Sequence, residues 1–365
     1  FRHKVPVGTL KKGEWNEVVF RVRQPEGKGG FFGEAPFIMN YFMECVLEGA
    51  WEYSATPLVP GPALKVQPAS SSFTKCRESN RVLGRAEQFH GPTLSPADAY
   101  AKMRATPDLA VDFLLSEPQI AQPTHFSFDT RGRLWVTQYR QYPYPAGVSM
   151  ISRDKYYRSH YDRVPPPPPH HDKGADIVSI HESTKHDGVY DKHTVFQDGL
   201  NMANSAVRAH GGVWVMNPPY LLFYPDANGD DVPDGPPVVH LSGFGLEDTH
   251  SVGNGIILGP DGWLYGVHGS TSSSRVVRPG FDSADAAPVH FEGCMVWRYH
   301  PKTREYDIFS EGSGNPFGLE FDGDGRMYSG HNGGTTRGWH YVQGGIYLKQ
   351  GVDPGKFGPP RTPYS

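Results

Sequence analysis

The sequence lacks a run of apolar residues long enough to cross a membrane, because a spanning helix needs roughly 18 of them and no stretch comes close. It also lacks any block of lysine and arginine, and its formal net charge is −4. Without a basic stripe, we do not expect nucleic acid as a partner. No signal peptide is recognisable and residue 1 is phenylalanine, so we expect an N-terminus that is processed, trimmed or not the start of the gene.

Cysteine is scarce, with three residues at Cys45, Cys76 and Cys294. None belongs to a CxxC or CxxCH pair, which argues against a zinc knuckle and a covalently attached haem. In an exported protein, a disulfide between Cys45 and Cys76 would leave Cys294 as a free thiol. The alternative is three unpaired thiols, and spacing alone does not decide between the two.

Turn-forming residues and aromatics are what the sequence has instead. There are 43 glycines and 34 prolines, and 13% of the residues are aromatic. This mixture predicts many short strands joined by turns. One stretch, residues 94–114, predicts a helix, because Ser95 can cap it, Pro96 suits its first position and Asp98 its first turn.

Four segments share one pattern: an apolar strand, a turn that contains glycine, and a second strand with a central aromatic residue. They are HFSFDTRGRLWVTQ from His125, SAVRAHGGVWVMN from Ser205, GIILGPDGWLYGVHG from Gly255 and GLEFDGDGRMYSGH from Gly318. Their central aromatic residues are Trp135, Trp214, Tyr265 and Tyr328. Two more strand-like stretches follow each of the first three hairpins. Four strands in a unit of roughly 50 residues are typical of a β-propeller blade.

The repeat predicts an all-β fold, a β-propeller of four-stranded blades over residues 94–365. About three and a half blades fit in this chain, and we expect about six in the intact protein. An open fan would expose long strand edges, so the missing blades would come from the rest of the chain or from another chain. Residues 1–93 do not follow the repeat and predict a small β-rich segment and linker, with a faint likeness to a jelly-roll domain around GEWNEVVFRV.

The strand order of a blade assigns each loop to one end of the propeller. If the first strand of each blade starts at the top, the loops that open blades and the ends of second strands lie there together. The candidate ligand-binding side chains at this end are His250, Asn254, Asn315, His268, His331, Asn332, Arg275 and Arg337. Such a rim suits a polar, oxygen-rich ligand. The alternatives are loop residues that only bond backbone groups, or a metal site of three histidines.

The opposite end carries a possible calcium loop, YPDANGDDVPDG. Its oxygen ligands would be Asp226, Asn228, Asp230 and Asp234, at alternating offsets that can wrap a hard cation. The glutamate that closes an EF-hand loop is absent, because Pro237 stands there. The alternative is an acidic turn in which the side chains bond their own backbone.

Several motifs together resemble a known family. The stretches DTHSVGNGIILGPDGWLYGVHG, VWRYHP, EYDIFSEGSGNPFGLEFD and VQGG resemble propellers of the membrane-bound dehydrogenase type. These are relatives of L-sorbosone dehydrogenase and of the soluble quinoprotein glucose dehydrogenases. The resemblance covers about residues 94–345 and is most specific over residues 245–330.

The resemblance implies roles for three positions. His250 matches the general base that takes the proton from a sugar hydroxyl while hydride leaves for pyrroloquinoline quinone. Asn315 matches the asparagine of a quinone-contacting Arg-Asn pair, and Gly314 stands where that pair has its arginine. Each lost charged hydrogen bond weakens binding by about 1.5–3 kcal/mol. Arg275 or Arg337 would have to supply the missing hydrogen bond to the quinone.

The sequence therefore predicts an exported oxidoreductase, periplasmic or extracellular, that oxidises a sugar, polyol or aldehyde. Its expected cofactors are pyrroloquinoline quinone and calcium, and its expected electron acceptor is a cytochrome c. The competing hypothesis is a noncatalytic propeller, stabilised by calcium, that binds glycans or a partner protein.

Overall fold

The computed structural model describes residues 94–154, 158–332 and 337–349, and three short strands nearer the N-terminus. The chain divides into two compact units, residues 1–95 and 96–365, whereas the predicted boundary falls two residues earlier. In the first unit, β1 (Phe37–Met39), β2 (Glu44–Val46) and β3 (Cys76–Arg77) form an antiparallel sheet. Its register places Cys45 opposite Cys76. Their side chains lie outside the described residues, so the disulfide stays a prediction.

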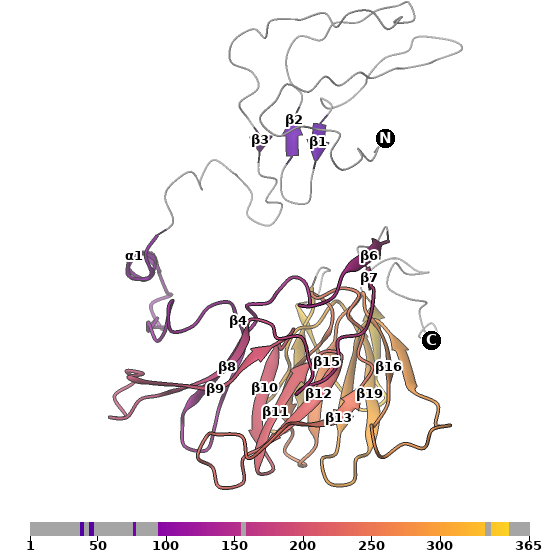
Figure 1. The fold of residues 1–365 in the computed structure, drawn as a ribbon. Helices are drawn as coiled ribbons and strands as arrows, with labels where there is room; N and C mark the ends of the chain where they lie inside the picture. The colour runs from indigo at the N-terminus through magenta and orange to yellow at the C-terminus, as the bar shows by residue number, and fades with distance from the viewer. Residues whose placement is uncertain are drawn as a thin grey trace, which may run out of the picture. The chain divides into compact units, whose positions relative to one another are not determined.

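The second unit is a β-propeller with four blades, and the predicted fold class is confirmed (Figure 1). The first blade consists of β4 (Pro123–Phe128), β5 (Leu134–Gln138), β8 (Asp176–Glu182) and β9 (Lys192–Leu200). The second consists of β10 (Ser205–Ala209), β11 (Gly212–Asn217), β12 (Tyr220–Pro225) and β13 (Val238–Ser242). Each strand pairs antiparallel with the next, so one blade is a simple meander.

The third and fourth blades differ from this plan at their outer strands. The third has β14 (Gly253–Leu258), β15 (Leu264–His268), β18 (Met295–Tyr299) and β19 (Tyr306–Ser313). The fourth has β20 (Glu320–Phe321), β21 (Met327–Gly330) and β22 (Gly338–Tyr341). The next strand, β23 (Ile346–Lys349), pairs in parallel with β19 and so covers the outer edge of the third blade.

Two hairpins interrupt the meanders at the same place, between the second and third strands of a blade. They are β6 (Met150–Arg153) with β7 (Ser159–Tyr161) in the first blade and β16 (Ser273–Val276) with β17 (Val289–Glu292) in the third. Such insertions lie at the end of the propeller where blades open, which we call the top face; β6 and β7 stand there in Figure 1.

The hydrophobic core lies between blades, in three clusters that each join neighbouring sheets. Trp135, Trp214 and Tyr265 are buried in these clusters, each facing the blade that follows its own. Burying one such side chain contributes about 1.5–3 kcal/mol. Tyr328 occupies the same position in the fourth blade but is 40% exposed, because no further blade packs on it in the described chain.

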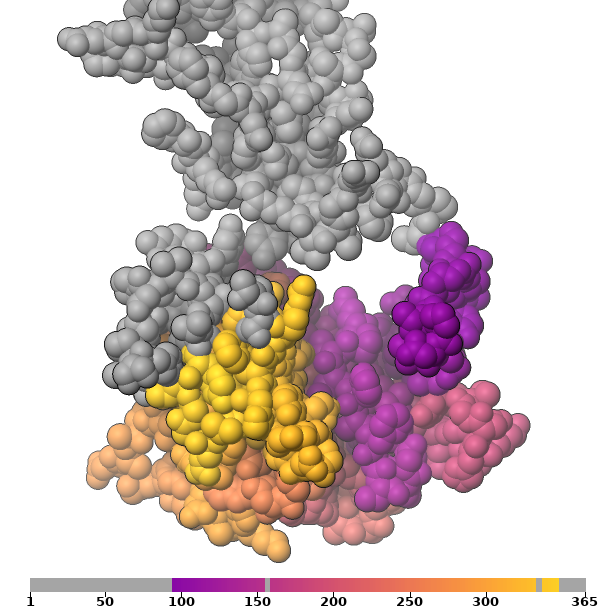
Figure 2. Space-filling view, turned by 180° about the vertical axis from the view of Figure 1, so that it is seen from behind, coloured from indigo at the N-terminus to yellow at the C-terminus, as the bar shows by residue number. Residues whose placement is uncertain are grey.

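The predicted helix over residues 94–114 is wrong in its extent. The helix α1 (Pro96–Lys102) begins where Ser95 and Pro96 predicted, but it ends within two turns and buries none of its residues. Pro107 accounts for part of this, because the residue before a proline is pushed out of the helical region. In Figure 2 the indigo segment around α1 stands out from the purple first blade.

One buried carboxylate holds the top of the first blade. Asp176, at the start of β8, has 0% exposure and accepts the backbone N–H groups of Gln141 at 2.5 Å and Ala203 at 2.8 Å. It thereby ties the insertion after β5 to the loop that opens the second blade. Burial raises the pKa of Asp176 to about 7, although these hydrogen bonds act to lower it.

Asp176 should make stability fall as pH rises. Because the folded pKa lies above the ordinary 3.8, the folded state holds the extra proton between that pH and about 7. Within this window Asp176 removes at most about 1.4 kcal/mol of unfolding free energy per pH unit. Asp176→Asn should lose this slope in urea unfolding measured at several pH values. Asp198→Asn, at an exposed position on β9, should keep it; an unchanged slope in Asp176→Asn would contradict the assignment.

Candidate functional site

The top face presents a histidine held by a carboxylate. His250 lies in the loop between β13 and β14, and its Nδ1 lies 2.8 Å from Oδ1 of Asp248. The same oxygen accepts the backbone N–H of His250 at 3.1 Å, a local turn that an aspartate two residues earlier favours. Thr271 donates its hydroxyl to Oδ2 of Asp248 at 2.5 Å. The His250 side chain is 48% exposed and that of Asp248 is 17% exposed.

The charge of Asp248 fixes the hydrogen on the imidazole. Burial alone would raise the pKa of Asp248, but hydrogen bonds from His250 and Thr271 hold it below its ordinary value. The carboxylate is therefore ionised near neutral pH and can only accept. Nδ1 of His250 must then carry the ring hydrogen, which leaves a lone pair on Nε2 when the ring is neutral.

A tyrosine of the first blade meets this lone pair. The phenol of Tyr142, in the insertion after β5, hydrogen-bonds to Nε2 of His250, and the two rings meet edge to face. Two more bonds join these loops: Tyr139 to the carbonyl of Thr249 at 3.3 Å, and the hydroxyl of Thr249 to the carbonyl of Pro143 at 2.8 Å. No spacing in the sequence pointed to Tyr142, whereas Asp248 stands in the same blade-opening loop as His250, which the strand order assigns to the top face.

The structure brings Asn315 to His250, as the predicted common rim requires. Nδ2 of Asn315 donates to the backbone carbonyl of His250 at 3.3 Å. Its Oδ1 accepts from the hydroxyl of Ser251 at 2.9 Å and from the backbone N–H of Ser270 at 3.0 Å. Asn315 thus positions the loop that carries His250, and its amide oxygen already has two donors.

Asn254 and His268 serve the fold in this arrangement. Asn254 has 0% exposure, donates to the carbonyl of Pro316 at 3.3 Å and accepts the N–H of Gly318 at 3.0 Å, which joins the third blade to the fourth. His268 also has 0% exposure; its Nδ1 faces backbone carbonyls and its Nε2 lies 2.8 Å from the Ser274 hydroxyl. Neither side chain presents an unused polar atom to a ligand at the rim.

His331 occupies the space beside Gly314. A Cβ on Gly314 would lie 2.6 Å from Cε1 of His331 and 2.9 Å from the carbonyl oxygen of Asn332. His331 is held there by a hydrogen bond from Nε1 of Trp339 to its Nδ1, and the N–H of Asn332 donates to the carbonyl of Gly314. The glycine at this position is therefore required by packing, and an arginine would displace His331.

The two predicted arginines are exposed, and the described contacts do not join them to His250. Arg275 lies on β16, where its backbone bonds to Gly243 at the end of the second blade. Arg337 precedes β22, and its carbonyl accepts the N–H of His331. The alternative of a three-histidine metal site also finds no support. Within the ranges that the structure describes, no group of three or more His, Cys, Asp and Glu side chains could hold a metal.

The predicted calcium loop lies at the opposite end, and its oxygens bond to the protein. Asp226 is 1% exposed and forms an ion pair of 2.6 Å with Arg208. Asp230 accepts from the side chain of Asn228 at 2.9 Å, and Asp234 accepts a backbone N–H of the loop at 2.7 Å. These contacts match the alternative of an acidic turn that bonds its own backbone. Calcium binding stays a prediction.

A substitution at Gly314 tests the packing beside His331. Gly314→Ala should destabilise the fold by about 1–3 kcal/mol, because the new Cβ must push His331 and the Asn332 carbonyl aside. Gly330→Ala, on neighbouring β21, is the control, since no atom lies within 4 Å of its Cβ. Urea unfolding measures both. Equal stabilities for the two variants would show that His331 does not hold this position.

Comparison with protein families gives one match: the family described as a domain of unknown function (DUF7133) matches residues 95–360. The comparison with curated proteins gave no match.

Several solved structures resemble the chain distantly. The PQQ-bound aldose sugar dehydrogenase of Streptomyces coelicolor is 14% identical, covers 66% of this chain and 67% of its own, and has a TM-score of 0.36. A protein described as an oxidoreductase (glucose dehydrogenase) from Thermus thermophilus is 17% identical. The match covers 66% of this chain and 69% of that protein, with a TM-score of 0.29. The extracellular domain of a one component system from B. thetaiotaomicron is 10% identical. The match covers 64% of this chain and 35% of that domain, with a TM-score of 0.24. At these values the likenesses assign no activity to the chain.

Proposed function

We propose that this chain, which belongs to the family described as a domain of unknown function (DUF7133), oxidises a hydroxyl-bearing substrate such as a sugar, polyol or hydrated aldehyde. The observation that carries the proposal is the Asp248–His250 pair. It presents a lone pair on a half-exposed imidazole at the face where the blades open. A neutral imidazole is the side chain best suited to accept a proton near pH 7.

The chemistry of the chain's own residues follows from these contacts. A substrate hydroxyl would replace the Tyr142 phenol at Nε2 of His250, or reach Nε2 through that phenol, and lose its proton there. The carboxylate of Asp248 would stabilise the imidazolium that forms. Hydride from the same carbon would pass to a bound two-electron acceptor.

Pyrroloquinoline quinone is the cofactor that the sequence predicts, but the residues of this face do not fit it. That quinone carries three carboxylates, and an arginine at position 314, where the resembling family has one, would have no room beside His331. Asn254 and His268 are committed to internal bonds, and the side chains of Arg275 and Arg337 make no described contact with His250. No step is therefore assigned to the quinone. An added quinone remains the first acceptor to try.

The surroundings of the reaction are part of the proposal. The proposal includes an exported, periplasmic or extracellular location and a cytochrome c as the electron acceptor. It also includes calcium in a structural role. In the part of the chain that the structure describes, no helix is long and apolar enough to cross a membrane.

A second function has one observation in its favour. Tyr142 already uses the lone pair of His250, and Asn315 uses its amide oxygen twice within the protein. A site whose polar atoms are satisfied before ligand arrives suits a propeller that binds a glycan or a partner protein without acting on it.

Replacing the base separates the two functions. His250→Asn should lower kcat/KM for dye reduction by about 10²–10⁴, the usual contribution of a general base, and should leave substrate binding largely intact. The assay uses a panel of aldoses and polyols, with and without pyrroloquinoline quinone and calcium. His210→Asn, in an exposed turn at the opposite end whose φ of 55° asparagine tolerates, is the control.

Two results would count against the oxidoreductase. Wild-type protein that binds an aldose but reduces no dye under any condition would favour the glycan-binding function. Turnover that His250→Asn leaves unchanged would move the chemistry to another residue.

A further inference from the structure

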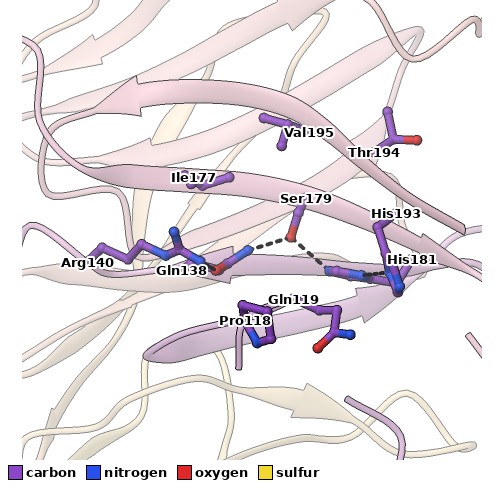
Figure 3. A pocket seen from close by; sticks show the side chains of 10 residues that line it. All are labelled: Pro118, Gln119, Gln138, Arg140, Ile177, Ser179, His181, His193, Thr194 and Val195. Atoms are coloured by element: carbon purple, nitrogen blue, oxygen red, sulfur yellow. Dashed lines mark hydrogen bonds between the residues drawn. The ribbon is translucent and has the colours of Figure 1, made fainter. Parts of the chain in front are cut away.

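A cavity in the first blade shares no residue with the His250 site. Its volume is ≈ 210 Å³, and it lies between residues 118–119 and the sheet of β5, β8 and β9 (Figure 3). The residues that line it are Pro118, Gln119, Gln138, Arg140, Ile177, Ser179, His181, His193, Thr194 and Val195. None of these ten is acidic, although three of them can carry positive charge.

A continuous chain of hydrogen bonds runs along the wall of this cavity. Nε2 of Gln138 donates to the Ser179 hydroxyl at 2.8 Å, since Oε1 of Gln138 is taken by other donors. That hydroxyl lies 2.9 Å from Nε2 of His181, and Nδ1 of His181 lies 2.8 Å from Nδ1 of His193. Gln138, Ser179 and His181 are 1–3% exposed, so this wall is fixed and its polar atoms are satisfied.

His181 contributes no charge to the cavity. Burial, and then the neighbouring His193, lower the pKa of His181 to about 4, so its ring is neutral near pH 7. The Ser179 hydroxyl can donate to Nε2 of His181 or to the carbonyl of Val136, which lies 3.4 Å away. His193 is exposed, so its imidazole can be reached from solvent.

Arg140 supplies the positive charge at the other end. Nη2 of its guanidinium donates to Oε1 of Gln138 at 2.6 Å. Its Nε is buried and has no hydrogen-bond partner. A buried donor on a charged group without an acceptor is costly, and such a group in a native protein calls for a ligand or water. No carboxylate among the described residues pairs with this guanidinium.

We propose that this cavity binds a small organic carboxylate, with the carboxylate on Arg140 and a hydroxylated chain extending toward Gln119 and His193. A guanidinium matches a carboxylate in geometry as well as in charge. The amide of Gln119 and the exposed imidazole of His193 offer partners for hydroxyl groups. The volume limits the ligand to a small molecule, such as a sugar acid of about six carbons.

Gluconate binding, measured by calorimetry on the whole chain, tests the proposal. Wild-type protein should bind gluconate, and Arg140→Gln should weaken binding by more than about tenfold, as expected for a lost charged hydrogen bond. Arg131→Gln, an exposed arginine in the turn of the same blade, should bind like wild type. His250→Asn should also bind like wild type, which separates this site from the proposed oxidation.

A second variant covers the case in which Arg140→Gln does not fold. Val195→Trp keeps the charge but places a large ring at the cavity from an exposed position, and it should abolish gluconate binding. Glucose and inorganic sulfate are the comparison ligands. The proposal is overturned if folded wild type does not bind gluconate at millimolar concentration. It is overturned equally if Arg140→Gln and Val195→Trp both bind gluconate like wild type, or if sulfate binds as tightly as gluconate.

Discussion

Apolar packing between the faces of successive blades supports everything else in this structure. A four-stranded sheet has two faces, and in a propeller each face is buried only by the neighbouring blade. Trp135, Trp214 and Tyr265 provide the centre of that contact at three successive interfaces. The contact sets the spacing of the blades, and so it brings together loops that are far apart in the sequence. His250 and Tyr142 meet because the blades that carry them are held in this way.

Polar contacts at the top face fix the positions of the loops that the packed blades bring together. Asn254 joins the third blade to the fourth, Asn315 holds the loop of His250, and Asp176 holds the insertion after β5. Each of these three side chains hydrogen-bonds to backbone groups of loops that would otherwise lack a partner. Most of the polar residues at this face are therefore structural, and the chemistry narrows to the few groups that remain accessible around Asp248 and His250.

The repeat of strand, turn and aromatic strand was enough to predict the blades, because a period-two pattern in short strands is local information. The same strand order predicted correctly that His250 and Asn315 share one end. It could not tell an accessible asparagine from a buried one, since the burial of Asn254 and Asn315 depends on the contacts that neighbouring blades make with them. Tyr142 was missed because it comes from an insertion whose path depends on tertiary contacts. The helix was overextended because the signals at Ser95, Pro96 and Asp98 mark only where a helix begins.

The family and the distant structural likenesses leave the activity to be decided by the site itself. The central claim is that Asp248 fixes the hydrogen of His250 on Nδ1 and leaves Nε2 as a proton acceptor. Nitrogen-15 NMR of the imidazole rings near neutral pH measures this directly, with His250→Asn used to assign the signals. The account predicts a protonated Nδ1 and an Nε2 that carries no hydrogen and accepts a hydrogen bond. A His250 ring with its hydrogen on Nε2 would contradict it.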